Sequence, residues 1–168
     1  MNHRLLLVRH AKSAWSVDAT DRMRPLSGRG QRDATALGAL LARRQIVPDV
    51  VWCSPAVRAC QTWQHAVEGG ARTEQLTHVD ELYEADGETL ASLISTAPAE
   101  ARTLLVIAHN SGIVDCVTAL TNRRGPAEAW RSIDRKYPTS AVAELRCPSW
   151  ADLAPGTATL TAYDIPRG

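Results

Sequence analysis

The chain has no phenylalanine and no excess of charge of either sign. Of its 168 residues, 19 are Lys or Arg and 18 are Asp or Glu, so the formal net charge is +1. This balance provides neither the basic surface typical of nucleic-acid binding nor an acidic solvating tail. Because Phe is absent while Trp occurs 5 times and Tyr 3 times, the aromatic volume of the core has to come from Trp and Tyr.

Long apolar runs and cysteines at metal-ligand spacing are also missing. The N-terminal apolar run, Leu5–Val8, is too short for a signal peptide and far shorter than the roughly twenty residues of a membrane span. The four cysteines, Cys53, Cys60, Cys116 and Cys147, form no CxxC pair, which favours reduced thiols. We therefore expect a cytoplasmic protein with no membrane association, no metal and no cofactor, whose oligomeric state the sequence leaves open.

Length and composition fit one globular domain over residues 1–168, since 45% of residues are hydrophobic and 22% are charged. Apolar runs at Leu5–Val8, Val50–Cys53 and Leu104–Ala108 are typical of strands buried on both faces. The other predicted elements are helices from the Ser27 cap to about Arg44, from Ser54-Pro55 to about Glu68, at Thr89–Thr96 and from Asn110 or Ser111 to about Leu120, with strands near Thr73–His78, Ala141–Cys147 and Thr157–Tyr163.

Strand and helix alternate through the first two-thirds of the chain. This alternation predicts a three-layer α/β/α domain with a mostly parallel central sheet, in which sites form at the carboxyl ends of the strands. Polar residues follow the apolar runs at these ends: Arg9-His10, then Ser54 with Arg58 one turn further, then His109-Asn110. If these strands are parallel neighbours, the polar side chains converge in one pocket.

Two guanidinium groups and two imidazoles in one pocket would suit a phosphoryl group. Arg58 falls early in a predicted helix, where side chains lean toward the N-terminus and where anions are already favoured. Arginine binds phosphate through paired, charge-assisted hydrogen bonds that lysine does not reproduce. A lone histidine here is more often structural and a lone arginine more often a surface charge, so the combination carries the hypothesis.

The segment Leu7–Trp15 resembles the Arg-His signature of the histidine phosphatase superfamily, which includes the phosphoglycerate mutases. Its Arg-His-Ala-Lys-Ser form is similar to the SixA-type phosphohistidine phosphatase branch. One departure is Ala11, where the superfamily motif usually has glycine. The resemblance covers nearly the whole chain through further segments in the same order, which are Arg24–Ser27, Ser54–Ala59, Glu81–Ala85, Ala108–Asn110 and Trp150–Leu153.

The resemblance implies a phosphoglycerate mutase-like fold and a metal-independent phosphatase. It implies that His10 is the nucleophile and becomes phosphorylated, while Arg9, Arg58 and His109 hold the phosphoryl oxygens. The residues by themselves do not decide which of the two histidines attacks.

The resemblance also suggests a proton donor and further substrate contacts. Glu81 stands where many superfamily members carry their acid, Asp80 is its rival, and the chain could also lack a dedicated acid. A donor active at neutral pH would need a raised pKa. The predicted substrate contacts are Lys12, Ser13, Arg24 and Asn110, of which Asn110 could equally serve only as a helix cap.

The substrate expected from these features is a phosphohistidine or another phosphoprotein reached through an open pocket. A chain of 168 residues leaves little length for the insertions with which mutase-type members enclose a sugar phosphate, which argues against mutase activity. Two alternatives stay open: a phosphatase of a small phosphomonoester such as a nucleotide or sugar phosphate, and a phospho-binding module without turnover. A binding module needs no nucleophile, so the intact His10 favours an enzyme.

Overall fold

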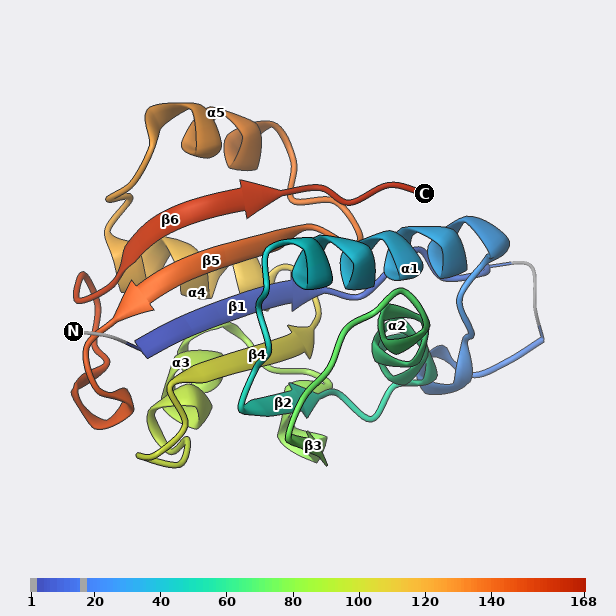
Figure 1. The fold of residues 1–168 in the computed structure, drawn as a ribbon, viewed down its shortest axis with the longest axis horizontal. Coiled ribbons are helices and arrows are strands. Elements are labelled where there is room, and N and C mark those ends of the chain that lie inside the picture. The colour runs from blue at the N-terminus through green and yellow to red at the C-terminus, as the bar shows by residue number, and fades with distance from the viewer. Residues whose placement is uncertain (1–2, 16–17) are drawn as a thin grey trace.

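The computed structural model describes residues 3–15 and 18–168, which form a six-stranded sheet with helices on both faces (Figure 1). The strands are β1 His3–Arg9, β2 Val50–Cys53, β3 Gln75–His78, β4 Thr103–Ala108, β5 Val142–Cys147 and β6 Thr159–Asp164. The helices are α1 Gly28–Arg43, α2 Val57–Glu68, α3 Gly87–Ser95, α4 Gly112–Thr121 and α5 Ala127–Arg135, with 3-10 turns η1 Asp21–Met23, η2 Asp80–Leu82 and η3 Trp150–Asp152.

The strand order in the sheet is β3-β2-β4-β1-β5-β6. The pairs β3–β2, β2–β4 and β4–β1 are parallel, whereas β5 runs antiparallel to both β1 and β6. The mostly parallel α/β sheet predicted from the sequence is therefore confirmed. As a result, β1, β2, β3 and β4 all end at the same edge of the sheet.

Successive side chains of β1 pack into two different hydrophobic cores, one on each face of the sheet. Leu5 and Leu7 pack with the side chains of α3, α4 and α5, whereas Leu6 and Val8 pack with those of α1 and α2. Figure 1 shows α1 and α2 on the near side of the sheet and α3 and α4 on the far side. Because side chains alternate across a strand, a sheet covered on both faces requires an apolar residue at every position, which explains the unbroken apolar runs.

Most predicted elements are confirmed, and α1 shows why. Its N-cap is Ser27, whose Oγ accepts a hydrogen bond from the Gly30 N–H at 3.1 Å, as the sequence predicted. The predicted start of α2 is wrong: the helix begins at Val57 rather than at Ser54-Pro55. The hydroxyl of Ser54 is instead engaged with His109 and with the Ala56 N–H, so it caps no helix.

Helix α5 was not predicted from the sequence. The signal was present and was missed: Trp130 and Ile133, three residues apart, are buried on one face of a short and otherwise mostly polar helix. All four cysteines are free thiols, as expected. Among the described residues, no helix combines the length and apolar character that crossing a bilayer requires.

Candidate active site

Side chains from the ends of three parallel strands meet at one point. His10 follows β1, Ser54 follows β2 and His109 follows β4, and these strands are neighbours in the sheet. The rings of His10 and His109 have their centroids 5.1 Å apart. The Ser54 hydroxyl lies 2.8 Å from His109 Nε2. The convergence predicted from the strand ends is therefore present in the structure.

The ring of His10 is held in one orientation. Its Nδ1 lies 2.7 Å from the carbonyl oxygen of Ala11, and because a carbonyl only accepts, Nδ1 carries the proton. The Ala11 N–H in turn donates to Thr62 Oγ1 at 2.9 Å, which ties this turn to α2. His10 is only 7% exposed, so solvent hardly reaches its ring. The lone pair of His10 therefore lies on Nε2.

Both imidazoles are neutral at neutral pH. Burial lowers the pKa of His10 to about 3, and the nearby His109, Arg58 and Arg9 act in the same direction. Burial also lowers the pKa of His109 to about 4, with the positive charge of Arg58 as the next cause. A neutral imidazole keeps the lone pair that nucleophilic attack requires.

Arg58 connects the two histidines. Its Nε donates to His10 Nε2 at 3.3 Å, and its Nη2 lies 3.5 Å from His109 Nδ1. Arg58 sits in the first turn of α2 and its side chain is buried, so its charge needs an anionic partner. That partner is Asp21, whose backbone carbonyl accepts from Nη1 at 2.6 Å and whose Oδ2 accepts from Nη2 at 3.2 Å.

Asp21 is a site residue that the sequence analysis missed. Besides Arg58, its carboxylate accepts hydrogen bonds from the Tyr83 hydroxyl at 2.5 Å and from Arg24 Nη2 at 2.9 Å. These donors, Tyr83 first, hold the pKa of Asp21 well below its ordinary value. The available signal was an acidic residue three positions before Arg24 in a polar segment. Asp21 is thus an ionised carboxylate among the cations that were expected to hold phosphate.

Two of the four predicted substrate contacts lie beside Asp21. Arg24 is buried, and its Nη1 donates to Ser13 Oγ at 2.5 Å. Its guanidinium also stacks on Trp15, with Cζ 3.7 Å from the ring centroid. The structure therefore brings Ser13 and Arg24 to the same cluster as Arg58.

Among the described residues, the remaining predicted cation and contacts form no hydrogen bond with the two imidazole rings. Arg9 Nη1 and Asn110 Nδ2 both donate to the carbonyl oxygen of Tyr137, at 2.9 and 3.2 Å. Burial lowers the pKa of Arg9. The Lys12 side chain is exposed, and it is the Lys12 backbone carbonyl that makes contacts, with Ser27. Arg9 and Asn110 share one anchor, whereas the structure gives the Lys12 ammonium no partner among the described residues.

The two candidate proton donors lie on the surface at η2. The Asp80 carboxylate is exposed and pairs with Arg22 at 3.6 Å. Glu81 is exposed and forms no hydrogen bond or ion pair with any described residue. It is their neighbour Tyr83 that reaches the pocket, with its ring edge-on to His109 and centroids 5.7 Å apart. A proton-donor role for Glu81 therefore stays a prediction.

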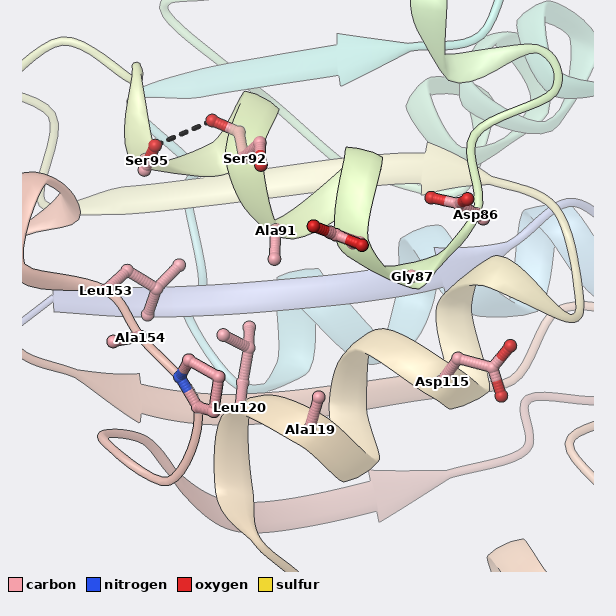
Figure 2. Close-up of a pocket in the computed structure, with 12 residues that line it drawn as sticks. Asp86, Gly87, Ala91, Ser92, Ser95, Asp115, Ala119, Leu120, Leu153 and Ala154 are labelled. Atoms are coloured by element: carbon pink, nitrogen blue, oxygen red, sulfur yellow. Dashed lines mark hydrogen bonds between the residues drawn. The ribbon is translucent and has the colours of Figure 1, made fainter.

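A separate pocket of about 570 Å³ lies between α3 and α4 (Figure 2). Leu153 and Ala154 lie at one end, Ala91 and Leu120 near the middle, and Asp86 and Asp115 at the other end. None of the predicted catalytic residues lines this pocket. The residues expected to carry phosphate chemistry lie in the histidine–arginine cluster instead.

Potential metal ligands gather outside that cluster. The cationic and imidazole groups around Arg58 suit an anion. In contrast, Cys53, Cys60 and His78 bring two sulfurs and an imidazole nitrogen within 4.8 Å of one another. The sequence analysis expected no metal site because these residues, 7 and 18 positions apart along the chain, match no ligand spacing.

Comparison with known proteins gives a consistent family. The profile of the Histidine phosphatase superfamily (branch 1) matches residues 5–142. An uncharacterized Mycobacterium tuberculosis protein is 36% identical over 163 residues, which cover 95% of this chain and 100% of its own length. A Nakamurella multipartitia structure, provisionally assigned as phosphohistidine phosphatase SixA, is similar with a TM-score of 0.80 and 30% identity over 98% of this chain and 96% of that one. A similarly assigned Agrobacterium tumefaciens structure has a TM-score of 0.79 and 28% identity over 99% and 100%.

Proposed function

Because the chain belongs to branch 1 of the histidine phosphatase superfamily, and so is a phosphohydrolase, we propose that it dephosphorylates phosphohistidine or another phosphorylated protein side chain without a metal ion. The observation that carries this proposal is the placement of Arg58 between His10 Nε2 and His109 Nδ1, at 3.3 and 3.5 Å. An anion at this point would meet a guanidinium and a neutral nucleophile together.

The reaction we propose has two steps. His10 Nε2 attacks phosphorus, the new N–P bond forms, and the bond to the leaving group breaks with its electron pair going to the leaving atom. Water then attacks the phosphorus bound to His10, which releases inorganic phosphate and restores the neutral imidazole of His10. Arg58, Arg9 and His109 would stabilise the negative charge on the equatorial oxygens of each transition state.

A protein substrate is supported by the surface around Arg24. Trp15, which stacks on Arg24, is 72% exposed. Met23, which precedes Arg24 in the chain, is 58% exposed. Large exposed apolar side chains beside a buried cation suit contact with a macromolecule better than enclosure of a small metabolite. The assignment of the similar Nakamurella and Agrobacterium proteins as phosphohistidine phosphatases supports the same substrate.

The exposed position of Glu81 and Asp80 also favours phosphohistidine. An alcohol leaving group needs a proton in the transition state, whereas a phosphohistidine imidazole can arrive already protonated near neutral pH. A site without a buried acid would therefore handle phosphohistidine better than an alkyl phosphate.

The experiment compares a histidine-phosphorylated protein, an aryl phosphate and a series of alkyl phosphates, each with and without a metal chelator. We expect the highest kcat/KM for phosphohistidine, no effect of the chelator, and inhibition by vanadate. A preference for a nucleotide or sugar phosphate would favour the small-molecule alternative. Recovery of a chelated enzyme only on adding a divalent metal would contradict the mechanism.

A second measurement tests the acid. The rates of Glu81→Gln and Asp80→Asn are compared with wild type across leaving groups of rising pKa. If either residue donates the proton, its variant loses most rate on the alkyl phosphates and little on aryl phosphates. If the rate loss of neither variant depends on the pKa of the leaving group, then no dedicated acid acts. That result would agree with phosphohistidine as the substrate. A steep series for Asp80→Asn alone would move the role from Glu81 to Asp80.

A further inference from the structure

We propose that Cys53, Cys60 and His78 form a zinc-binding site separate from the phosphate pocket. Their two sulfurs and one imidazole nitrogen all lie within 4.8 Å of one another. Cys53 ends β2, His78 ends β3, and Cys60 is the fourth residue of α2. Three separate elements thus supply one ligand each, and nothing in the phosphatase chemistry uses these groups.

The sheet register fixes two of the three ligands side by side. Cys53 pairs with His78 in the parallel ladder between β2 and β3, so both side chains project from the same face of the sheet. Cys53 belongs to the core formed with α1 and α2, which identifies this face as the one that α2 covers. The third ligand, Cys60, comes from α2 itself and donates through Sγ to the Ser54 carbonyl at 3.5 Å. The thiol is thereby held over the end of β2.

The distances suit a tetrahedral zinc ion. With Zn–S bonds of about 2.3 Å, tetrahedral geometry places two sulfurs roughly 3.8 Å apart. The observed separations of at most 4.8 Å exceed this by no more than about 1 Å, which side-chain rotation can supply. Two thiolates and an imidazole are ligands that zinc prefers, whereas magnesium and calcium require oxygen. Three protein ligands leave the fourth position for water.

Access and location separate this site from the phosphate pocket. His78 is exposed at the edge strand β3, so an ion reaches the cluster directly from solvent. None of the three ligands forms a hydrogen bond with His10 or His109 in the structure. Cys53 does precede Ser54 in the chain, and Cys60 follows Arg58 by one intervening residue, so an ion here would cross-link the two segments that carry these pocket residues.

The test measures zinc binding by the reduced protein in competition with a chromogenic chelator, and repeats it with cobalt as a spectroscopic probe. We expect one zinc per chain in wild type and a thiolate-to-cobalt charge-transfer band. Cys60→Ser and His78→Ala should each weaken zinc binding by at least roughly tenfold, since even outer-shell changes cost about that much. Cys60→Ser should also weaken the charge-transfer band. Both residues are less buried than Cys53, so these variants should fold.

Two controls distinguish this cluster from other histidines. His65→Ala removes a histidine of α2 that lies outside the cluster, and it should leave zinc affinity unchanged. His10→Asn removes an imidazole of the phosphate pocket and should also leave it unchanged. Zinc should raise the Tm of wild type and of both controls but not of His78→Ala. Full zinc affinity in Cys60→Ser and His78→Ala, or loss of zinc in His10→Asn, would overturn the proposal.

Discussion

The two sides of the phosphate pocket are held in place by different means. On one side, His10, Ser54 and His109 follow buried strands. The His10 ring is held by the Ala11 carbonyl, and the His109 ring is held by the Ser54 hydroxyl. On the other side, Asp21 and Arg24 come from the segment between β1 and α1, where ion pairs hold them. The Asp21 side chain is 55% exposed, whereas His10 is nearly inaccessible.

Under the proposed function, the strand side would carry the chemical step and the loop side would help to hold the anion. A residue at a strand end is positioned by the hydrogen-bond ladder of the whole sheet, which gives the precision that a nucleophile needs. Ion pairs near the surface contribute little stability each and rearrange easily. Arg58 joins the two sides, because it contacts His10, His109 and Asp21 at once. We therefore expect changes on the strand side to abolish the reaction and changes on the loop side to tune it.

The largest effect is expected from His10→Asn, which removes the proposed nucleophile from the strand side. Turnover should fall to background, and no acid-labile phosphoenzyme should be trapped when the reaction is quenched with labelled substrate. His65→Asn should retain both. Label trapped on His109 instead would reverse the roles of the two histidines, and full turnover without any phosphoenzyme would contradict covalent catalysis.

Arg58→Ala tests the residue that joins the two sides. Loss of one preorganised charge contact usually costs about a hundred- to a thousand-fold in rate, and we expect a kcat loss of that size. Arg58→Lys should recover little of it, because an ammonium does not reproduce a guanidinium that contacts two imidazoles and a carboxylate. Arg22→Ala, at an exposed arginine of η1, is the matched control. A Lys variant at the wild-type rate would show that the geometry of Arg58 is unimportant.

Asp21→Asn is expected to have a smaller effect, in the opposite direction. The Asp21 carboxylate already occupies donors of Arg58 and Arg24, so removing its charge should leave those cations freer for an incoming oxyanion. We expect vanadate to inhibit several-fold more tightly, with a smaller change in kcat than for Arg58→Ala. Asp80→Asn should leave vanadate inhibition unchanged. Weaker inhibition in Asp21→Asn would mean that the carboxylate mainly orients the arginines.

The smallest effect concerns the pH dependence of folding stability. In the folded protein the pKa of His10 is lowered to about 3, whereas in the unfolded chain it returns to about 6.5. Between these values the unfolded state binds more protons, so stability falls as the pH drops below about 6.5. Denaturant unfolding between roughly pH 4 and pH 7 should show a shallower loss for His10→Asn than for wild type. Equal slopes would contradict the burial of a neutral His10.

Much of the framework could be predicted from the sequence because its signals are local. Val50–Cys53 forms β2 with the predicted bounds, since a strand buried on both faces is apolar at every position. Ser27 caps α1 for a similarly local reason: its hydroxyl accepts a hydrogen bond from the N–H of Gly30, only three residues further along the chain. The convergence of His10 and His109 followed as well, because parallel neighbouring strands place the residues after them at the same edge.

What the tertiary structure alone decided are contacts between elements that no local pattern encodes. Tyr83 meets Asp21 across 62 residues, and Cys53 meets His78 through a strand register that the sequence leaves open. The strand ends predicted Ser54 near the pocket, but its hydrogen bond to His109 in place of a helix cap depends on how β2, β4 and α2 pack. Composition and periodicity report which side chains are buried and where an element starts. The partner of a charge or a thiol depends instead on distances between elements, which packing alone sets.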